Sequence, residues 1–428
     1  MVIKLIYCYS WGSKQTGKDY ALKNFDAFVV VFKNVCSQVF PEESSMDRVT
    51  MAHGAGGSVM SDLIKNHVLK HLGGSNVEVP LEALDDSAVV DGIVLKSDSH
   101  AVKPLFFPGG DIGRLAVAGT VNDIAMIGAE PIALTCGMVL EEGLLLADLD
   151  RILESMEQAC IEAGVFVVTG DTKVIEKSGF GGCIINTSGI GKRGEALEHN
   201  IATVKKCRSF DSRWVLDSNL REGDMLIVSG TVGDHGVTIL SAQEGYDFGS
   251  KIQSDVAPLN KVVKKLLEVG GIVSMKDPTR GGLSNSLNEW SVKSNVGFMV
   301  HEPKVPIRGD VRTACEMLGL DPMEIGNEGK VLIGVVHQKA EEVLSALRET
   351  KEGRDAQIIG EATCDFSEVV LETVVGGKRI MAPPVGDPVP RQYRSRAKRR
   401  RNNVGNADYT LELTQQQGGT EWLSLDRQ

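Results

Sequence analysis

The 428-residue sequence predicts a mixed α/β protein (α+β type) of two domains, and three observations lead to that prediction. Apolar residues recur at strand spacing in some segments and at helical spacing in others. Glycines punctuate the pattern from near Arg48 until it stops near Pro383. Two successive series of strand, glycine-rich loop and helix fill that span, so we expect two α/β halves.

The first half is predicted to begin with a hairpin. Asp91-Gly92 divides two apolar-rich runs in SAVVDGIVLKSD, and this dipeptide suits a type I′ turn because both central residues need positive φ. Apolar residues at helical spacing then predict helices over 112–128 and 149–164, each ending at a glycine. The runs VFVVT (165–169) and CIINTSGI (183–190) predict strands.

A second series starts with the strand MLIVSG at Met225. Later strands are expected near GFMV and VLIGVV, and helices near 311–318 and 340–347. Between the two halves, residues 200–220 show neither clean periodicity nor turn chemistry, so we expect an unpatterned insertion or linker there.

These patterns divide the chain into five predicted segments. They are an extension (1–47), an N-terminal α/β domain (48–199) to which the family resemblance described below assigns ATP binding, the linker (200–220), a C-terminal α/β domain (221–382) and a tail (383–428). Both ends lack the pattern of the body, so we expect them to be disordered or to reflect a gene model with misplaced boundaries. The native chain would then start near Met46 and, as the family resemblance described below implies, end in cysteine.

Composition argues against several classes of partner. A formal net charge of −11 would repel nucleic acid and anionic membranes over most of the surface. No apolar run approaches the roughly 20 residues that span a bilayer. The eight cysteines are scattered without a C-x-x-C pair, which favours reduced thiols and a cytoplasmic location.

Two apparent phosphate-binding motifs are discounted. GSKQTGKD (12–19) resembles a Walker A loop, but Asp19 replaces the Ser or Thr whose hydroxyl would reach magnesium. GIGKRG (189–194) fits G-x-G-x-x-G, yet the charged EALEHN follows it instead of a close-packing helix. We predict a turn at the second motif.

Carboxylates beside glycines at predicted strand ends are the stronger signal. Each Asp-Gly pair taken alone is more often a turn or a helix cap. Asn122 and Asp123 are harder to explain in that way, because they interrupt an apolar helix where neither residue is favoured. Since Mg²⁺ prefers oxygen ligands and shares them with nucleotide phosphates, the whole set indicates a metal–nucleotide site.

Two further features bear on chemistry. AHGAGGS (52–58) is either a loop whose backbone approaches an anion or a flexible linker, and local sequence leaves both open. Glu328 precedes a predicted strand, and Lys173 follows Gly170-Asp171. A lysine near a glutamate can hold it ionised as a general base, although the spacing does not tell whether the two meet.

Together these motifs closely resemble a known family. AHGAGGSVMSDLI, TVNDIAMIGAEPIALTCGMVLEEG, VTGDTKV, VSGTVGDHG, DPTRGGL and NEGKVLIGV resemble the HypE hydrogenase maturation proteins, carbamoyl dehydratases of the aminoimidazole ribonucleotide synthetase and selenophosphate synthetase superfamily. The resemblance spans roughly 49–391 and implies a two-domain fold whose N-terminal domain forms the dimer and the ATP site. The glycine loop lacks the reactive Cys or Sec with Lys of selenophosphate synthetase, which favours the hydrogenase branch.

The resemblance implies an activity, cofactors and partners. A carbamoyl group on a C-terminal cysteine would be dehydrated with ATP and Mg²⁺ to a thiocyanate, the cyanide donor for [NiFe] hydrogenase. The implied partners are a second copy in a homodimer, a HypF-like carbamoyltransferase and the HypC–HypD complex.

The resemblance also assigns residues to roles. Lys173 and Glu328 would be catalytic. The implied nucleotide-binding residues are His53, Gly54, Gly56, Gly57, Asp85, Asn122, Asp171, Thr172, Asp234 and Asp277. The implied metal ligands are Asp86, Asp98, Asp123 and Asp234.

The sequence departs from the family at its end. HypE chains finish in P-R-[I/V]-C, whereas here DPVPR at 387–391 is followed by residues without any cysteine. A catalytically incomplete ATP-binding scaffold is therefore the alternative, and a synthetase acting on a free small molecule is a third possibility. ATP-dependent loss of water from a carbamoylated cysteine would separate the dehydratase from both.

Overall fold

The computed structural model describes residues 48–74, 76–245 and 252–386. The chain divides into a small N-terminal unit, Met1–His53, and a large unit, Gly54–Gln428, and the architecture below belongs to the large unit. The expected extension 1–47, the Walker-like motif 12–19 and the tail from residue 387 lie outside the described residues.

The first layer is a five-stranded sheet with strand order β1-β2-β7-β5-β6. Its strands are β1 (Ala88–Val90), β2 (Ile93–His100), β5 (Glu130–Glu141), β6 (Phe166–Ile175) and β7 (Cys183–Lys192). β5 and β6 are parallel, and the other neighbours are antiparallel. The predicted hairpin is confirmed, because Asp91 and Gly92 have φ of 50° and 77° between β1 and β2.

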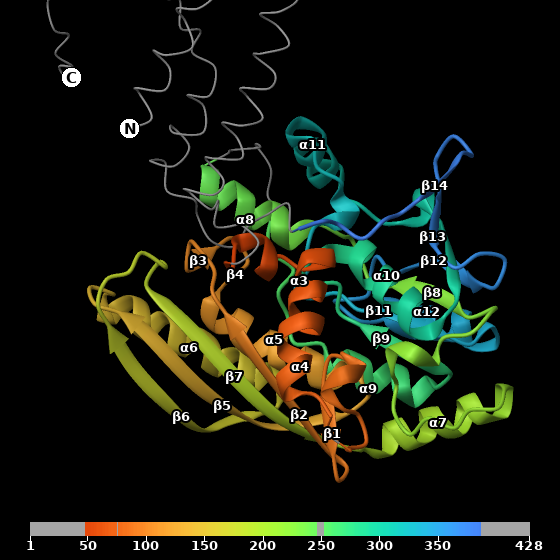
Figure 1. Cartoon of the computed structure of the whole chain (residues 1–428), viewed down its shortest axis with the longest axis horizontal. Helices are drawn as coiled ribbons and strands as arrows, with labels where there is room; N and C mark the ends of the chain where they lie inside the picture. Colours follow the sequence, from red (N-terminus) through yellow and green to blue (C-terminus); the bar gives the residue numbers. More distant parts are fainter. Residues whose placement is uncertain (1–47, 75, 246–251, 387–428) are drawn as a thin grey trace, which may run out of the picture. The chain divides into compact units, whose positions relative to one another are not determined.

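Helices α5 (Ile112–Met126) and α6 (Leu146–Ala163) cover one face of this sheet (Figure 1). We call it the covered face. The opposite face, here called the open face, carries exposed apolar side chains, among them Leu95, Phe166 and Val168. β6 forms the edge, and all its residues are exposed.

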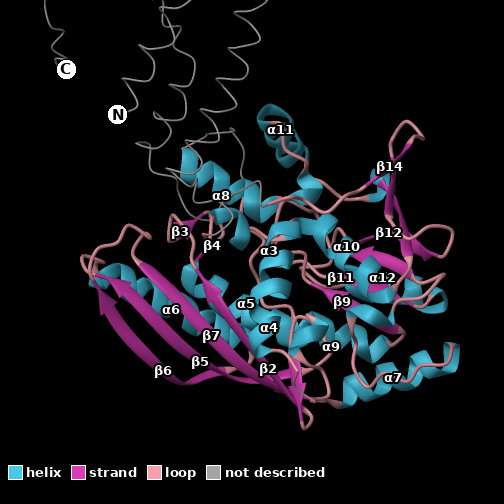
Figure 2. Cartoon of the chain, viewed as in Figure 1, coloured by secondary structure: helices cyan, strands magenta, loops and turns pink. Residues whose placement is uncertain are grey.

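The second sheet has seven strands in the order β14-β13-β10-β12-β8-β11-β9. They are β8 (Met225–Val228), β9 (Ile272–Lys276), β10 (Gly297–His301), β11 (Leu332–Val335), β12 (Gln357–Thr363), β13 (Val369–Glu372) and β14 (Lys378–Ile380). Its helices (Figure 2) are α7 (Glu195–Cys207), α8 (Asp234–Glu244), α9 (Asn260–Val269), α10 (Gly282–Ser294), α11 (Gly309–Leu318) and α12 (Ala340–Arg348).

Shorter elements complete the described fold. They are the helix α3 (Gly57–Leu63), which continues through the π-turn η3 (Ile64–Val68) into α4 (Leu69–Leu72), the strand pair β3 (Phe106–Phe107) and β4 (Gly110–Asp111), and the 3₁₀ turns η2 (Met51–Gly54), η4 (Leu81–Ala83), η5 (Asp217–Asn219), η6 (Glu302–Lys304), η7 (Pro322–Glu324) and η8 (His337–Lys339). The type of every predicted helix and strand is confirmed.

Helix α5 joins the two halves. Asp111 caps its first turn by accepting hydrogen bonds from the N–H groups of Gly113 and Arg114, at 2.8 and 3.0 Å. Ile124 and Met126 near its end belong to the apolar core shared with the second sheet, whereas its earlier residues pack in the core with α6. The helix is therefore buried along nearly its whole length, and its polar residues Asn122 and Asp123 lie at the junction of the halves.

Helix α7 replaces the first part of the unpatterned linker that we expected over 200–220. Leu197, Ile201 and Val204 form its buried stripe, which charged neighbours obscured in the sequence. The following connector, residues 208–220, is also packed. Trp214 is 1% exposed, and its Nε1 donates to Glu78 Oε1 over 2.9 Å.

The turn predicted at GIGKRG is also wrong. β7 runs through this motif to Lys192, and α7 begins at Glu195. A Cβ on Gly189 or Gly191 would lie 2.6 or 2.4 Å from the Ile124 side chain, so these glycines allow α5 to approach the strand closely. They serve helix–sheet packing.

Candidate functional site

Three carboxylates from distant parts of the sequence meet where the two halves join. Asp86 lies just before β1, Asp123 lies on α5, and Asp277 follows β9. One oxygen from each lies within 4.8 Å of the others. Asp123 and Asp277 are buried, and Asp86 is nearly so. We call this cluster the acid triad.

Two lysines balance the triad, Lys276 with a buried side chain and Lys96 with one that is 24% exposed. Lys96 Nζ lies 2.6 Å from Asp123 Oδ2, and Lys276 Nζ lies 2.9 Å from Asp86 Oδ1. Lys96 reaches the triad because alternate residues of β2 point to the covered face, where α5 lies. Sequence analysis missed both lysines. Two signals were available: Lys96 is an ionisable residue at an inward position of a strand, and Lys276 directly precedes Asp277.

The triad carboxyls hold protons more tightly than ordinary carboxyls do. Burial raises the pKa of Asp123 to about 7, opposed by Lys96 and reinforced by Asp86 and Asp98. Burial also raises the pKa of Asp86, and burial together with the neighbouring acids raises that of Asp277 well above its usual range. A cation would relieve this repulsion between buried like charges.

The donor set fits Mg²⁺. Three converging carboxylates offer the hard oxygen ligands that Mg²⁺ takes in small number beside nucleotide phosphates. Asp277, which we expected to contact nucleotide, is one of the three candidate metal ligands. The donor set leaves out two of the expected ligands, Asp98 and Asp234, among the residues that the structure describes.

Asp98 is near enough to raise the pKa of Asp123 but is not one of the three converging carboxylates, and Asp234 lies on another element. Asp98 is on β2, where its Oδ2 is 3.4 Å from His100 Nε2. Asp234 starts α8, where Thr231 donates to it and Arg308 lies 3.9 Å away. Burial raises the pKa of Asp234 to about 6.

A second buried network adjoins the triad through Lys276. Its Nζ also contacts Asp217 Oδ2 at 3.1 Å and Glu289 Oε2 at 3.2 Å. Asp217 belongs to the connector, and its backbone N–H donates to Asp85 Oδ1 over 3.0 Å. Burial raises the pKa of Asp85 to about 6. No sequence signal marked Asp217, because the connector looked unpatterned.

Asn122, which we expected to bind nucleotide, forms hydrogen bonds with backbone groups of the second half. It is 1% exposed, its Oδ1 accepts from Leu259 N over 2.7 Å, and its Nδ2 donates to Ala257 O over 3.1 Å. Nδ2 also approaches the carbonyl oxygen of Glu328 at 3.5 Å. Because backbone groups occupy both ends of the amide, this geometry favours positioning of the segment beside Glu328 over contact with nucleotide.

Glu328 is buried and acts electrostatically on Asp277 of the acid triad. It is 3% exposed, and its N–H donates to Asp255 Oδ1 over 3.1 Å. Its charge is among the causes that raise the pKa of Asp277. The charge of this predicted catalytic carboxylate therefore reaches Asp277.

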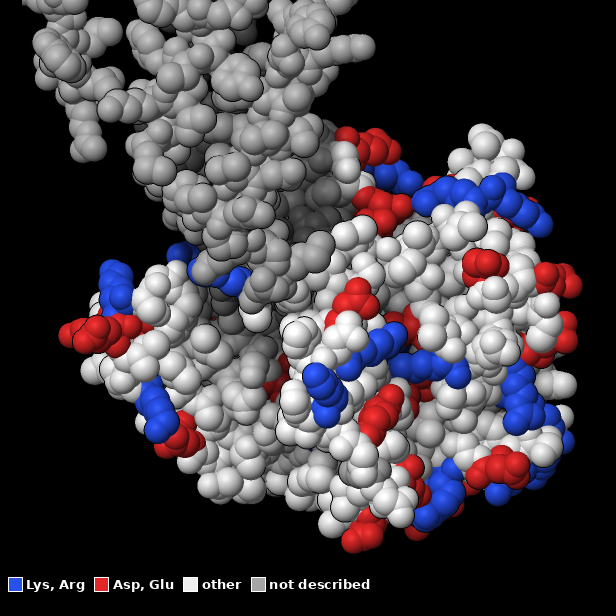
Figure 3. Space-filling model, viewed as in Figure 1, with Lys and Arg blue, Asp and Glu red and all other residues white. Residues whose placement is uncertain are grey.

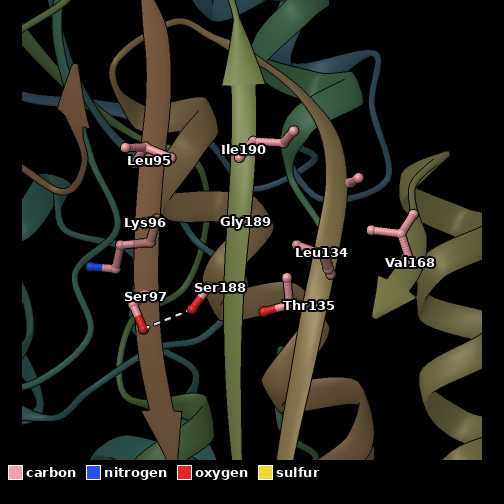
Figure 4. A pocket seen from close by; sticks show the side chains of 10 residues that line it. Leu95, Lys96, Ser97, Leu134, Thr135, Val168, Ser188, Gly189 and Ile190 are labelled. Carbon is pink, nitrogen blue, oxygen red and sulfur yellow. Dashed lines mark hydrogen bonds between the residues drawn. The ribbon is translucent and has the colours of Figure 1, made fainter. Parts of the chain in front are cut away.

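Lys173 lies away from Glu328 in a single chain. It pairs with Val139 across β5 and β6, and strand alternation directs it to the open face together with Asp171. Their side chains are 73% and 74% exposed and lie 3.9 Å apart. Thr172, between them, is also exposed. Figure 4 shows the centre of this open face, where Leu95, Ile190 and Val168 surround a shallow depression of about 440 Å³.

The glycine loop packs against the DPTRGGL motif and against Pro384. Gly56 and Gly57 have φ of 77° and 73°. A Cβ on Gly56 would lie 3.0 Å from Arg280 Cβ, and one on Gly57 would lie 1.9 Å from Pro384 O. The glycines therefore allow the loop backbone to approach other parts of the protein closely, namely Arg280 and Pro384.

Pro384 is packed, although we expected the tail to begin at 383, and its neighbours Pro383 and Val385 are exposed. Ser284 Oγ donates to Ala382 O over 2.9 Å, and Pro384 is buried beside Gly57 and Gly281. The last described residues thus pass beside the glycine loop.

The start of the glycine motif is less informative. His53 belongs to the small N-terminal unit, where Thr50 N donates to its Nδ1 over 3.0 Å. A Cβ on Gly54 would meet no atom within 4 Å.

The surface and helices give two further findings. On the face in Figure 3, outside the grey atoms, basic and acidic side chains are interspersed, and the basic ones do not gather into one continuous patch. Among the described residues, no helix combines the length and the apolarity needed to cross a membrane.

Comparison with known proteins gives consistent results across the chain. The family model for the N-terminal domain of AIR synthase related proteins matches residues 84–192, and the model for their C-terminal domain matches residues 221–371. A putative hydrogenase expression/formation protein of Methanocaldococcus jannaschii is 48% identical over 353 residues, covering 80% of this chain and 99% of the relative. The carbamoyl dehydratase HypE of Azotobacter vinelandii is 43% identical over 345 residues, covering 80% and 96%.

Solved structures agree in fold. A chain from a HypE–HypF complex matches with a TM-score of 0.68 and 42% identity, covering 75% of this chain and 99% of that one. A hydrogenase maturation protein HypE in complex with ATP matches with a TM-score of 0.64 and 40% identity, covering 80% and 99%. These matches confirm the predicted two-domain α/β fold.

Proposed function

The chain belongs to the HypE family of hydrogenase maturation proteins, and from that premise we propose that it dehydrates a cysteine-bound S-carboxamide to a thiocyanate with ATP. The observation that carries the proposal is the meeting of the acid triad and its two lysines at one junction, where the buried Glu328 acts electrostatically on Asp277. The product would supply cyanide ligands to [NiFe] hydrogenase.

The chemistry requires a leaving group and a base. A carbamoyl oxygen leaves poorly until ATP converts it into a phosphate ester, after which loss of phosphate and of the N–H protons completes the dehydration. Mg²⁺ held by Asp86, Asp123 and Asp277 would offset the phosphate charge when bound. Glu328, buried and acting electrostatically on Asp277, is our candidate for the proton acceptor.

The C-terminal segment supports delivery of a carrier thiol to this junction. Pro384 packs beside Gly57 and Gly281. Pro384 therefore lies beside the motif that contains Asp277.

We also propose a homodimer formed through the open face. Exposed Leu95, Phe166 and Val168 make this face unusually apolar for a surface in water. Lys173 projects from the same face. Since it does not reach Glu328 within one chain, a catalytic role for Lys173 would depend on the neighbouring copy.

The remaining proposals concern partners and compartment. A relative was solved in a HypE–HypF complex, which supports a HypF-like carbamoyltransferase as the carbamoyl donor. We infer that a HypC–HypD complex receives the cyanide. Six cysteines of the described residues are unpaired, which fits a reducing compartment such as the cytoplasm.

The test uses the chain through Arg391 followed by Val-Cys, with cyanate to carbamoylate the final thiol. Mass spectrometry of the C-terminal peptide after addition of ATP and Mg²⁺ should show loss of one water. The matched chain ending in Val-Ser should show none. Glu328→Gln should bind ATP and fail to lose water. Phosphate release without any mass change would instead favour the ATP-binding scaffold.

A further inference from the structure

Asp217 is a buried carboxylate that the proposed mechanism does not use. It is 2% exposed, and four groups contact it or depend on it. Lys293 Nζ lies 2.6 Å from Oδ2, and Trp290 Nε1 donates to Oδ1 over 2.7 Å. Lys276 Nζ lies 3.1 Å from Oδ2, and the Asp217 N–H holds Asp85.

The arrangement fixes the Lys276 ammonium. A lysine has three N–H donors, and those of Lys276 face Asp86, Asp217 and Glu289 at 2.9, 3.1 and 3.2 Å. With two acceptors outside the triad, Lys276 makes its contact to Asp86 through Oδ1 only. The Lys276 ammonium is therefore a counterion fixed next to Asp86 of the acid triad.

We propose that Asp217 is a positioning residue for the metal–nucleotide site, holding Lys276 back so that Asp86 remains available to a divalent cation. This inference rests on the proposed function. Without the Asp217 carboxylate, Lys276 would lose one of its two outer acceptors and would compete more strongly with the cation for Asp86. The site would also become less negative, which weakens cation binding in the same direction.

A purely structural role makes a different prediction. Asp217 then would stabilise the junction of the connector with α10 and leave metal binding unchanged in any variant that folds. Asp224 is the matched control. It is 2% exposed, lies just beyond the connector, and is held by Arg208 at 2.6 Å and by Arg221 N at 2.8 Å, without a contact to Lys276.

The experiment measures binding of a non-hydrolysable ATP analogue to the full chain by calorimetry, as a function of Mg²⁺ concentration. Asp217→Asn should raise the Mg²⁺ concentration for half-maximal binding by about 10-fold, the usual effect of removing a residue that supports a metal ligand. Asp217→Glu, which restores the charge, should recover part of that loss. Asp224→Asn should lower thermal stability and leave the Mg²⁺ requirement unchanged.

The outcomes separate the two proposals. Wild-type protein that binds no Mg²⁺–nucleotide would overturn the proposed function itself. Wild-type binding with an unchanged Mg²⁺ requirement in Asp217→Asn, or with an equal shift in Asp224→Asn, would overturn the role of Asp217 alone. If Asp217→Asn does not fold, Trp290→Phe removes one hydrogen bond to Asp217 without a charge change. It should shift the requirement in the same direction, and no shift would contradict the proposal.

Discussion

Asn122 on α5 accepts a hydrogen bond from the backbone N–H of Leu259 over 2.7 Å, which ties the first half of the protein to the second. Its Nδ2 completes the link at Ala257 O over 3.1 Å. Asn122→Ala should therefore lower the free energy of unfolding by about 2 to 4 kcal/mol, because two buried backbone groups lose their partner. Urea denaturation followed by circular dichroism measures the loss.

Asn200 provides the matched control for that substitution. It is 0% exposed, and its amide makes two 2.8 Å hydrogen bonds with the N–H and C=O of Ile272. Asn200→Ala should cost a similar free energy of unfolding and leave ATP turnover per folded molecule unchanged. Asn122→Ala should also reduce turnover, because it releases the segment beside Glu328. Equal turnover in the two variants would count against a positioning role for Asn122.

Trp214→Ala tests whether the connector is part of the core. The side chain is 1% exposed, stacks with the Arg193 guanidinium 4.8 Å from the ring, and donates to Glu78. Its removal should cost about 3 to 5 kcal/mol of unfolding free energy. Arg213→Ala next to it removes a pair whose arginine is 65% exposed, and should cost less than about 1 kcal/mol. Equal small effects in urea denaturation would make the connector a loose linker.

Sequence patterns predicted the fold where local spacing determined it. The Asp91-Gly92 hairpin, the buried helix α5 and the strands near Met225 and Leu332 followed from period and turn chemistry alone. Helix α7 did not, because charged residues surround its apolar stripe of Leu197, Ile201 and Val204. A short stripe among charges gives a weak signal before tertiary packing is known.

The sequence predicted several residues of the site but only some of the contacts between them. Asp123 stood out because an acid in an apolar helix needs a partner, and the structure supplies Lys96 and the triad. Lys276 and Asp217 could not be paired from sequence, since their contact joins β9 to the connector across 59 positions. For a similar reason the sequence did not show whether Lys173 and Glu328 meet, because only the strand register shows which face of the sheet Lys173 occupies.

Glu141 should make stability depend on pH at the acid end. Its carboxylate accepts hydrogen bonds from the backbone N–H groups of 178–182 and from the Ser178 hydroxyl. Burial acts to raise its pKa, but the N–H donors outweigh it and lower the pKa from the usual 4.5 to about 2. A lowered pKa stabilises the folded state fully above pH 4.5, and this contribution disappears as the pH falls through 2.

Glu141→Gln should accordingly be less stable than wild type at neutral pH, since its amide donors would face the loop N–H groups. The difference in unfolding free energy should shrink between pH 4.5 and pH 2 in urea titrations. Glu142→Gln, at the exposed neighbouring position, should show no such pH-dependent difference. A difference that stays constant with pH would mean that the charge of Glu141 does not order the loop.

Val168→Asp tests the proposed dimer at the open face. Val168 is 64% exposed on β6 and lines the depression in Figure 4 with Leu134 and Ile190. If a second copy covers this face, the aspartate would be buried without a partner, a cost that should convert the dimer into monomer. Val375→Asp, 88% exposed between β13 and β14, introduces the same charge elsewhere and should leave the mass unchanged. Light scattering coupled to size exclusion gives the mass of each, and a wild-type monomer or an unchanged Val168→Asp dimer would exclude this face as the interface.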